Sequence, residues 1–255
     1  HPSYLDIGDM YALGEVPIEE HVLGTMHNVR TMLDHGYTAA VSGASAKHRL
    51  DLVIRNEIAA GRIPGPRLRA CTPEITVTGG LGDVRQMHLH HDLTGVVLDG
   101  PEAIRTYVRT LIREGVDSVK LMISGDNFVR TGTADMTLME PDEIDAACRV
   151  ARAHGRRIIA HARTAQSVKL ALAGGCDLVY HANFCDTEAL DLLEAARDRV
   201  FVNPAIGLSY AALHEMGDYG IDRDTAELWG FRHELEGALE TMQALRKRGV
   251  RVLPF

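Results

Sequence analysis

Short apolar runs alternate with longer segments of helical period along almost the whole chain. Seven runs have the composition of buried strands, and most of them follow a glycine closely: 38–42, 67–71, 118–123, 157–162, 178–182, 200–204 and 251–253. Between them, 101–113 and 141–153 repeat apolar residues at helical spacing, and 222–248 also has the pattern of a helix. Two stretches, 74–100 and 206–224, interrupt this rhythm and are predicted to be long loops.

Apolar strands separated by helices predict a parallel sheet that helices cover on both faces. Right-handed crossovers between seven such strands indicate either a barrel or a doubly wound sheet. The chain has 255 residues, close to the ~250 typical of a (β/α)8 barrel. No G-x-G-x-x-G or Walker motif is present to favour a nucleotide-binding sheet. We therefore predict an α/β fold of the TIM-barrel type, forming one domain over residues 1–255.

The charge and cysteine content of the chain narrow the range of molecules that the protein could bind. A net charge of −8 without a block of basic residues argues against nucleic acid, and no apolar run approaches the length of a membrane span. The cysteines form no C-x-x-C pair, which is typical of reduced thiols in a cytoplasmic protein; they are Cys71, Cys148, Cys176 and Cys185. We expect a cytoplasmic homo-oligomer that acts on a small-molecule substrate.

Polar side chains within or at the ends of the apolar runs are the candidates for chemistry, because active sites of parallel α/β folds lie at the carboxyl ends of the strands. They are Lys120, His161, His181 and Asn203. Each one alone has a structural interpretation, as a core histidine satisfied by a carbonyl or as a paired lysine. Two histidines on consecutive strands, with a lysine one strand earlier, favour a metal site. The segment 88–91, which contains three histidines, lies in a loop without strand pattern and is not favoured.

Several strings resemble the amidohydrolase superfamily, and within it the imidazolonepropionase-like and prolidase-like members. The strings are Leu33-Asp34-His35-Gly36-Tyr37-Thr38, Pro66-Arg67 followed by Thr78-Gly79-Gly80, Asp117-Ser118-Val119-Lys120, Ile159-Ala160-His161-Ala162 and Val179-Tyr180-His181-Ala182. The resemblance covers nearly the whole chain. Two positions depart from the family pattern: Leu81 replaces a frequent histidine, and Ala182 replaces a frequent glycine.

The resemblance implies two divalent metal ions, with zinc expected, held by an H-x-H motif, a carboxylated lysine, two further histidines and an aspartate. Lys120, His161 and His181 match the central ligands, and His1 matches the second histidine of the H-x-H motif. The other histidine would precede residue 1, and the aspartate would follow Phe255. We therefore expect a barrel cut at both ends, without the small β-sandwich of the family.

The resemblance also implies hydrolysis of a C–N bond in an amide, peptide, cyclic amide, urea or carbamate. A hydroxide bridging the metals would attack, with a carbamate formed from carbon dioxide on Lys120 and with His161 and His181 completing the catalytic set. Arg163 is a candidate to bind a substrate carboxylate, although it could be a surface arginine at a helix start. Tyr210 is a candidate to polarise the carbonyl.

Two other functions stay open at the level of sequence. A Schiff-base lyase or aldolase barrel would use Lys120 as its nucleophile, but it would leave the pair of histidines unexplained. A barrel without catalytic activity could bind a ligand only.

Overall fold

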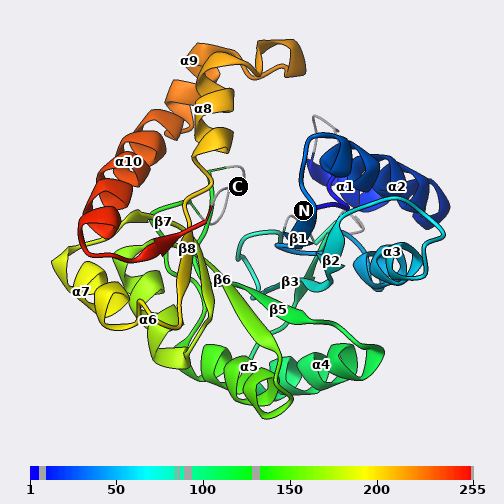
Figure 1. The fold of residues 1–255 in the computed structure, drawn as a ribbon. Helices are drawn as coiled ribbons and strands as arrows, with labels where there is room; N and C mark the ends of the chain where they lie inside the picture. The colour runs from blue at the N-terminus through cyan, green and yellow to red at the C-terminus, as the bar shows by residue number, and fades with distance from the viewer. Residues whose placement is uncertain (6–9, 84, 86, 89–93, 128–132, 254–255) are drawn as a thin grey trace.

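The strands of the computed structural model fan around a common centre, with the helices outside them (Figure 1). The structure describes residues 1–5, 10–83, 85, 87–88, 94–127 and 133–253. Its strands are β1 (Ala39–Val41), β2 (Arg67–Arg69), β3 (Cys71–Thr76), β4 (Gly95–Val97), β5 (Ser118–Met122), β6 (Arg157–Thr164), β7 (Leu178–Phe184), β8 (Phe201–Asn203) and β9 (Arg251–Val252). Its α-helices are α1 (Met10–Glu15), α2 (Ile18–Asp34), α3 (Leu50–Ala59), α4 (Pro101–Glu114), α5 (Pro141–Ala153), α6 (Ala165–Gly174), α7 (Thr187–Ala195), α8 (Ile206–His214), α9 (Arg223–Leu228) and α10 (Phe231–Lys247).

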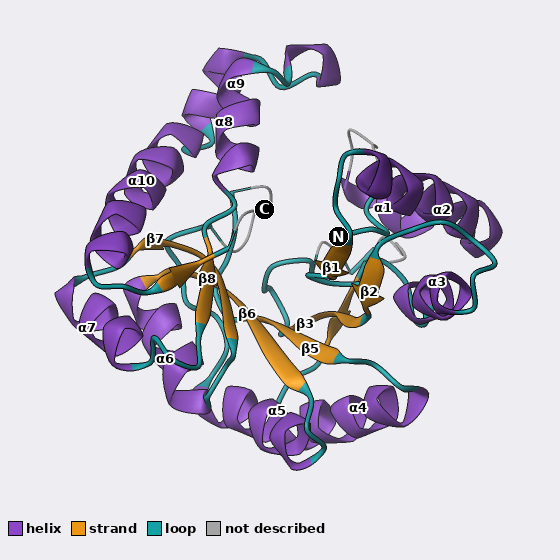
Figure 2. Ribbon diagram, viewed as in Figure 1, coloured by secondary structure: helices purple, strands orange, loops and turns teal. Residues whose placement is uncertain are grey.

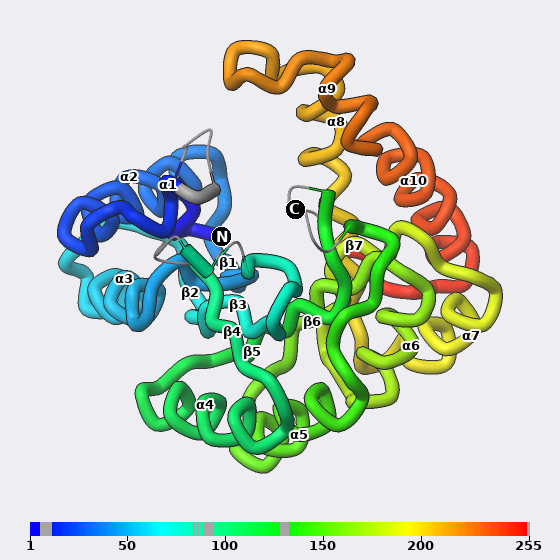
Figure 3. The backbone as a smooth tube through the Cα atoms, turned by 180° about the vertical axis from the view of Figure 1, so that it is seen from behind, coloured from blue at the N-terminus to red at the C-terminus, as the bar shows by residue number. Residues whose placement is uncertain are grey.

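Parallel pairing joins all of these strands, which confirms the predicted α/β class. The large sheet has the order β4-β3-β5-β6-β7-β8-β9, and β1 pairs with β2. Only Ala70 separates β2 from β3, so β1 and β4 lie beside successive parts of one extended segment (Figure 3). Within the described residues the outer strands β4 and β9 each pair on one side only. The parallel sheet is thus observed, and its closure into a barrel stays a prediction.

Capping and amphipathic packing explain why the helices form where they do. Helix α4 begins with Pro101 at its first turn and ends at Gly115, whose φ of 106° is the left-handed conformation that glycine adopts at low cost. Its buried stripe includes Ile104 and Val108, which pack against the strands in the main core. Helices α4 to α7 and α10 surround the sheet in this way (Figure 2). The helices expected over 101–113 and 141–153 are confirmed.

A repeated aspartate anchors the amino ends of two strands. The Asp117 carboxylate accepts a hydrogen bond from the backbone N–H of Ala70 at 2.8 Å, and Asp177 accepts one from Ile158 at the same distance. Each aspartate thereby ties its own strand to a neighbouring one. These bonds fix the register that brings the carboxyl ends of β5, β6 and β7 together.

The prediction of two long loops is wrong in part, because each stretch contains regular secondary structure. The 74–100 stretch contains the end of β3 and all of β4, and 206–224 contains α8 and a turn of 3-10 helix over Gly217–Tyr219. The single helix expected over 222–248 is two helices, α9 and α10, separated at Trp229 and Gly230. Helix α8 forms because Ala212 and Leu213 pack against Phe231 in a small second core, and residues distant in sequence complete that core. No described helix combines the length and apolar character that membrane crossing requires.

Candidate metal centre

His161 and His181 lie side by side on the adjacent strands β6 and β7. Their imidazole centroids are 4.4 Å apart, and the side chains are only 3% and 8% exposed. The pairing of β6 with β7 shifts register between Ala162 and Thr164, a bulge of the kind that redirects side chains near active sites. The structure thus brings together the two histidines that the sequence singled out.

The backbone in the middle of β7 is strained. His181 has a φ of 77° and Ala182 a φ of 50°, both in the left-handed region that residues with a β-carbon rarely occupy. Such a conformation costs about 1–3 kcal/mol per residue and persists only where surrounding contacts enforce it. Strain of this kind is concentrated at functional sites, and here it turns the His181 imidazole toward His161.

Asp126 completes a cluster of three possible metal ligands. One ligand atom from each of Asp126, His161 and His181 lies within 4.8 Å of the others, and all three residues are buried. Asp126 Oδ2 is 3.7 Å from His161 Nε2, and the Gly125 carbonyl oxygen is 3.0 Å from the same nitrogen. Sequence reasoning missed Asp126. The available signal was a carboxylate in the polar segment that follows the strand of Lys120.

The protonation state of both imidazoles suits a metal ion, and the His181 ring has no hydrogen-bond partner among the described residues. Burial, helped by the nearby Arg163 cation, holds the pKa of both histidines well below the ordinary value, so both rings are neutral at pH 7. Neutral imidazole is the form that binds metals. Among the described residues, neither ring nitrogen of His181 has a hydrogen-bond partner. A neutral ring nitrogen without a protein partner is available to bind a metal ion.

Lys120 is buried in the middle of β5, with 1% of its surface exposed. Its Nζ atom lies 4.0 Å from the centroid of the Tyr180 ring, and its register partner on β3 is Glu74. Burial lowers the pKa of Lys120 to about 8, although the Glu74 carboxylate acts in the opposite direction. A substantial fraction of the amine is therefore neutral at mildly alkaline pH, and the neutral amine is the form that reacts as a nucleophile.

His1 approaches the same tyrosine. Its ring centroid is 6.4 Å from that of Tyr180, and its Nδ1 lies 3.3 Å from the Ala44 carbonyl oxygen. Gly43 makes this approach possible, because a β-carbon at that position would come within 3 Å of both rings. His1 and Lys120 thus gather around Tyr180, and the cluster of possible metal ligands contains neither of them.

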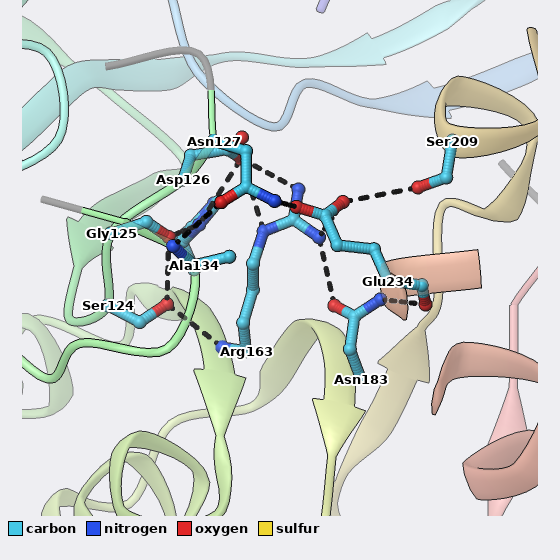
Figure 4. A network of polar contacts seen from close by, with 10 residues as sticks. Ser124, Gly125, Asp126, Asn127, Ala134, Arg163, Asn183, Ser209 and Glu234 are labelled. Carbon is cyan, nitrogen blue, oxygen red and sulfur yellow. Dashed lines mark hydrogen bonds and ion pairs between the residues drawn. The ribbon is translucent and has the colours of Figure 1, made fainter. Parts of the chain in front are cut away.

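The remaining candidates have different surroundings. Arg163 is 1% exposed and makes hydrogen bonds or ion pairs to Asp126, Asn183 and Glu234, so it is not a surface arginine (Figure 4). Tyr210 lies on α8, 49% exposed, with its ring 4.7 Å from that of His214. Substrate binding by Arg163 and Tyr210 stays a prediction.

Two further polar positions give no support for a site. The Asn203 Oδ1 atom accepts a bond from the backbone N–H of Ala205 at 3.3 Å, which is a local structural role. In the 88–91 segment His88 is exposed, and His90 and His91 lie outside the described residues.

Comparison with known proteins places these features in a recognised fold. No protein-family model matches the chain. Ochratoxinase from Aspergillus niger is 25% identical to it over 150 residues, which are 52% of this chain and 31% of that protein. A solved prolidase complexed with N-methylphosphonate-L-proline matches with a TM-score of 0.86 and 21% identity, covering 99% of this chain and 62% of its own. The solved A. niger ochratoxinase matches with a TM-score of 0.80 and 19% identity, covering 99% and 60%.

The sequence match thus spans about a third of the curated ochratoxinase, and the structural matches span about three-fifths of the solved structures. Over that span the chain has the fold of the solved prolidase and ochratoxinase structures, which is the fold predicted by the resemblance of its sequence to prolidase-like members of the amidohydrolase superfamily.

Proposed function

We propose that residues 1–255 form the barrel domain of a metal-dependent hydrolase that cleaves a C–N bond in a small molecule. The observation that carries this proposal is the pair of buried, neutral imidazoles, His161 and His181, on adjacent parallel strands. The similarity to prolidase and ochratoxinase supports the same class of reaction.

The residues present fit divalent metal ions. Imidazole nitrogens and carboxylate oxygens are ligands that zinc prefers. His161 and His181 would hold one ion. Lys120 and His1 would serve a second, with Lys120 adding carbon dioxide to its neutral amine and releasing a proton to give an anionic carbamate. Because the carbamate replaces the ammonium group, the protein would also avoid the energetic cost of burying that cation.

The metal ions and the residues around them would then have separate roles in the reaction. When bound, divalent ions polarise a substrate carbonyl and lower the pKa of a water molecule that can attack it. His161 and His181 keep fixed directions because bulge and backbone strain orient them. Arg163 would contribute positive charge near a substrate carboxylate, and Tyr210 would donate a hydrogen bond to the carbonyl oxygen.

Metal analysis of the full-length protein tests the proposal. We expect two zinc-like ions per chain in the wild type and a loss of bound metal in the His181→Ala and Lys120→Ala variants. The matched control is His27→Ala, because His27 is exposed on α2 and should leave the metal content unchanged. A screen of N-acyl amino acids and X-Pro dipeptides against aryl ureas, with the metal-loaded protein, would identify the substrate class.

Two results would overturn the proposal. One is a His181→Ala or Lys120→Ala variant that keeps both full metal content and full activity. The other is a wild-type protein free of metal in which borohydride traps a substrate on Lys120. That result would favour the Schiff-base lyase, which also uses a buried lysine.

A further inference from the structure

A network of buried polar contacts surrounds the Arg163 guanidinium (Figure 4). It includes Asp126, which belongs to the same cluster as His161 and His181. The Nε and Nη2 atoms of Arg163 donate to Asp126 Oδ2 at 3.2 and 2.7 Å. Its Nη1 atom donates to Asn183 Oδ1 at 2.9 Å and lies 3.0 Å from Glu234 Oε2. Arg163 therefore connects a carboxylate beside the histidines to a second carboxylate on α10.

Glu234 is the far end of this network, and none of its surface is exposed. Besides Arg163, its carboxylate accepts hydrogen bonds from Asn127 Nδ2 at 2.7 Å and from Ser209 Oγ on α8 at 3.2 Å. The Asn183 amide donates to the backbone carbonyl of Glu234 at 2.9 Å. Through these bonds α8 and α10 are fixed to the carboxyl ends of β6 and β7 and to the segment that follows β5.

The charges in this network do not balance. One guanidinium faces two buried carboxylates, so Asp126, Arg163 and Glu234 together carry a net charge of −1 when both acids are ionised. Burial raises the pKa of Glu234 to about 7, although Arg163 opposes the shift. An uncompensated buried charge is unfavourable. A divalent cation beside Asp126 would neutralise the excess, and the unpartnered imidazole of His181 lies at the same place.

We propose that Asp126 is an oxygen ligand of the ion held by His161 and His181, and that Arg163 and Glu234 are positioning residues that orient its carboxylate. This inference rests on the proposed metal centre and extends it to residues outside the ligands that the family resemblance implies. Arg163 directs two N–H groups to a single oxygen of Asp126, which fixes the direction of that carboxylate. Glu234 in turn fixes the guanidinium through Nη1.

The role of Glu234 is therefore indirect, of the kind that outer partners of metal ligands have. Without its carboxylate, Nη1 of Arg163 would keep Asn183 as its partner, and the guanidinium would have freedom to rotate. The Asp126 carboxylate would then lose its fixed direction relative to the histidines. Metal affinity should fall even though no direct ligand has changed.

Metal affinity measured at pH 8, where Glu234 is ionised, tests this inference. Zinc binding to the full-length protein is measured by competition with a chelator, for wild type, Asp126→Asn, Glu234→Gln and the double variant. We expect Glu234→Gln, which removes an outer partner, to weaken zinc binding about 10-fold, and Asp126→Asn, which alters the ligand itself, to weaken it more. Because both act through one carboxylate, the double variant should bind zinc no more weakly than Asp126→Asn alone.

Two further measurements separate positioning from a structural role. Glu227→Gln is the matched control, because Glu227 pairs with Arg232 near the surface and should leave zinc affinity unchanged. The visible absorption of the cobalt-substituted protein should change in Asp126→Asn, since a ligand is altered. Asp126→Asn leaves the Arg163–Glu234 pair intact, so it keeps the inference testable if Glu234→Gln does not fold.

The outcomes are distinct. If the wild type binds no divalent metal, the proposed function itself fails. If the wild type binds zinc and Asp126→Asn binds it equally well with an unchanged cobalt spectrum, only the role of Asp126 is refuted. If Glu234→Gln lowers the melting temperature but keeps wild-type zinc affinity, Glu234 is structural and the positioning role is refuted.

Discussion

Replacing Arg163 by methionine should destabilise the protein strongly. Methionine keeps an unbranched side chain of similar length but removes the charge that faces Asp126 and Glu234. Removing one partner of a buried ion pair costs about 3–5 kcal/mol, because the remaining charge stays buried and uncompensated. For 255 residues, an unfolding entropy of about 2.1 cal/mol/K per residue converts this loss to a fall in melting temperature of roughly 6–9 °C.

Chemical and thermal unfolding of metal-free protein at pH 8 would measure this loss. Arg62→Met is the matched control, since Arg62 pairs with Glu57 at the surface and its side chain is 63% exposed. Exposed pairs contribute little to stability, so the control should unfold close to wild type. The reasoning is refuted if Arg163→Met unfolds as late as Arg62→Met.

The effect of Arg163→Met should also depend on pH. Without the guanidinium, the pKa of Glu234 should rise further, because Arg163 normally lowers it. The loss of stability relative to wild type is therefore largest above that raised pKa, and it shrinks as the pH falls and Glu234 takes up a proton. A difference equally large at pH 5 and pH 8 would argue against this electrostatic origin.

Three other substitutions have expected outcomes. In wild type the Glu234 pKa of about 7 lies above its ordinary value of 4.5, so the folded state retains a proton between these two pH values. The free energy of unfolding should then fall by about 3 kcal/mol as the pH rises from 4.5 to 7, and it should stay constant above pH 7. In urea titrations, Glu234→Gln should remove most of this pH dependence. Gly115→Ala should cost about 1 kcal/mol, since φ is 106°. Gly207→Ala should raise the free energy of unfolding by about 0.5–1 kcal/mol, because Gly207 lies within α8 and has open space for a β-carbon. An equal loss of stability at both glycines would contradict this reasoning about backbone conformation.

Much of the fold follows from local patterns. Helix α5 could be placed because Pro141 fits the first turn, Glu143 accepts a hydrogen bond from the backbone N–H of Glu140, and apolar residues repeat at helical spacing. The strands of His161 and His181 could be placed because apolar runs follow glycines. Helix α8 could not be placed, because it depends on packing against Phe231, which the local sequence does not indicate.

The sequence by itself determined the alternation of strands and helices and which histidines end neighbouring strands, since hydrophobic period and capping are properties of adjacent residues. Only the tertiary structure decided that Asp126 lies beside those histidines and that Glu234, on a distant helix, faces Arg163. A buried charge needs a partner, but any acid in the chain could supply it. The path of the backbone through space selects which one does, and that path depends on contacts between residues far apart in the chain.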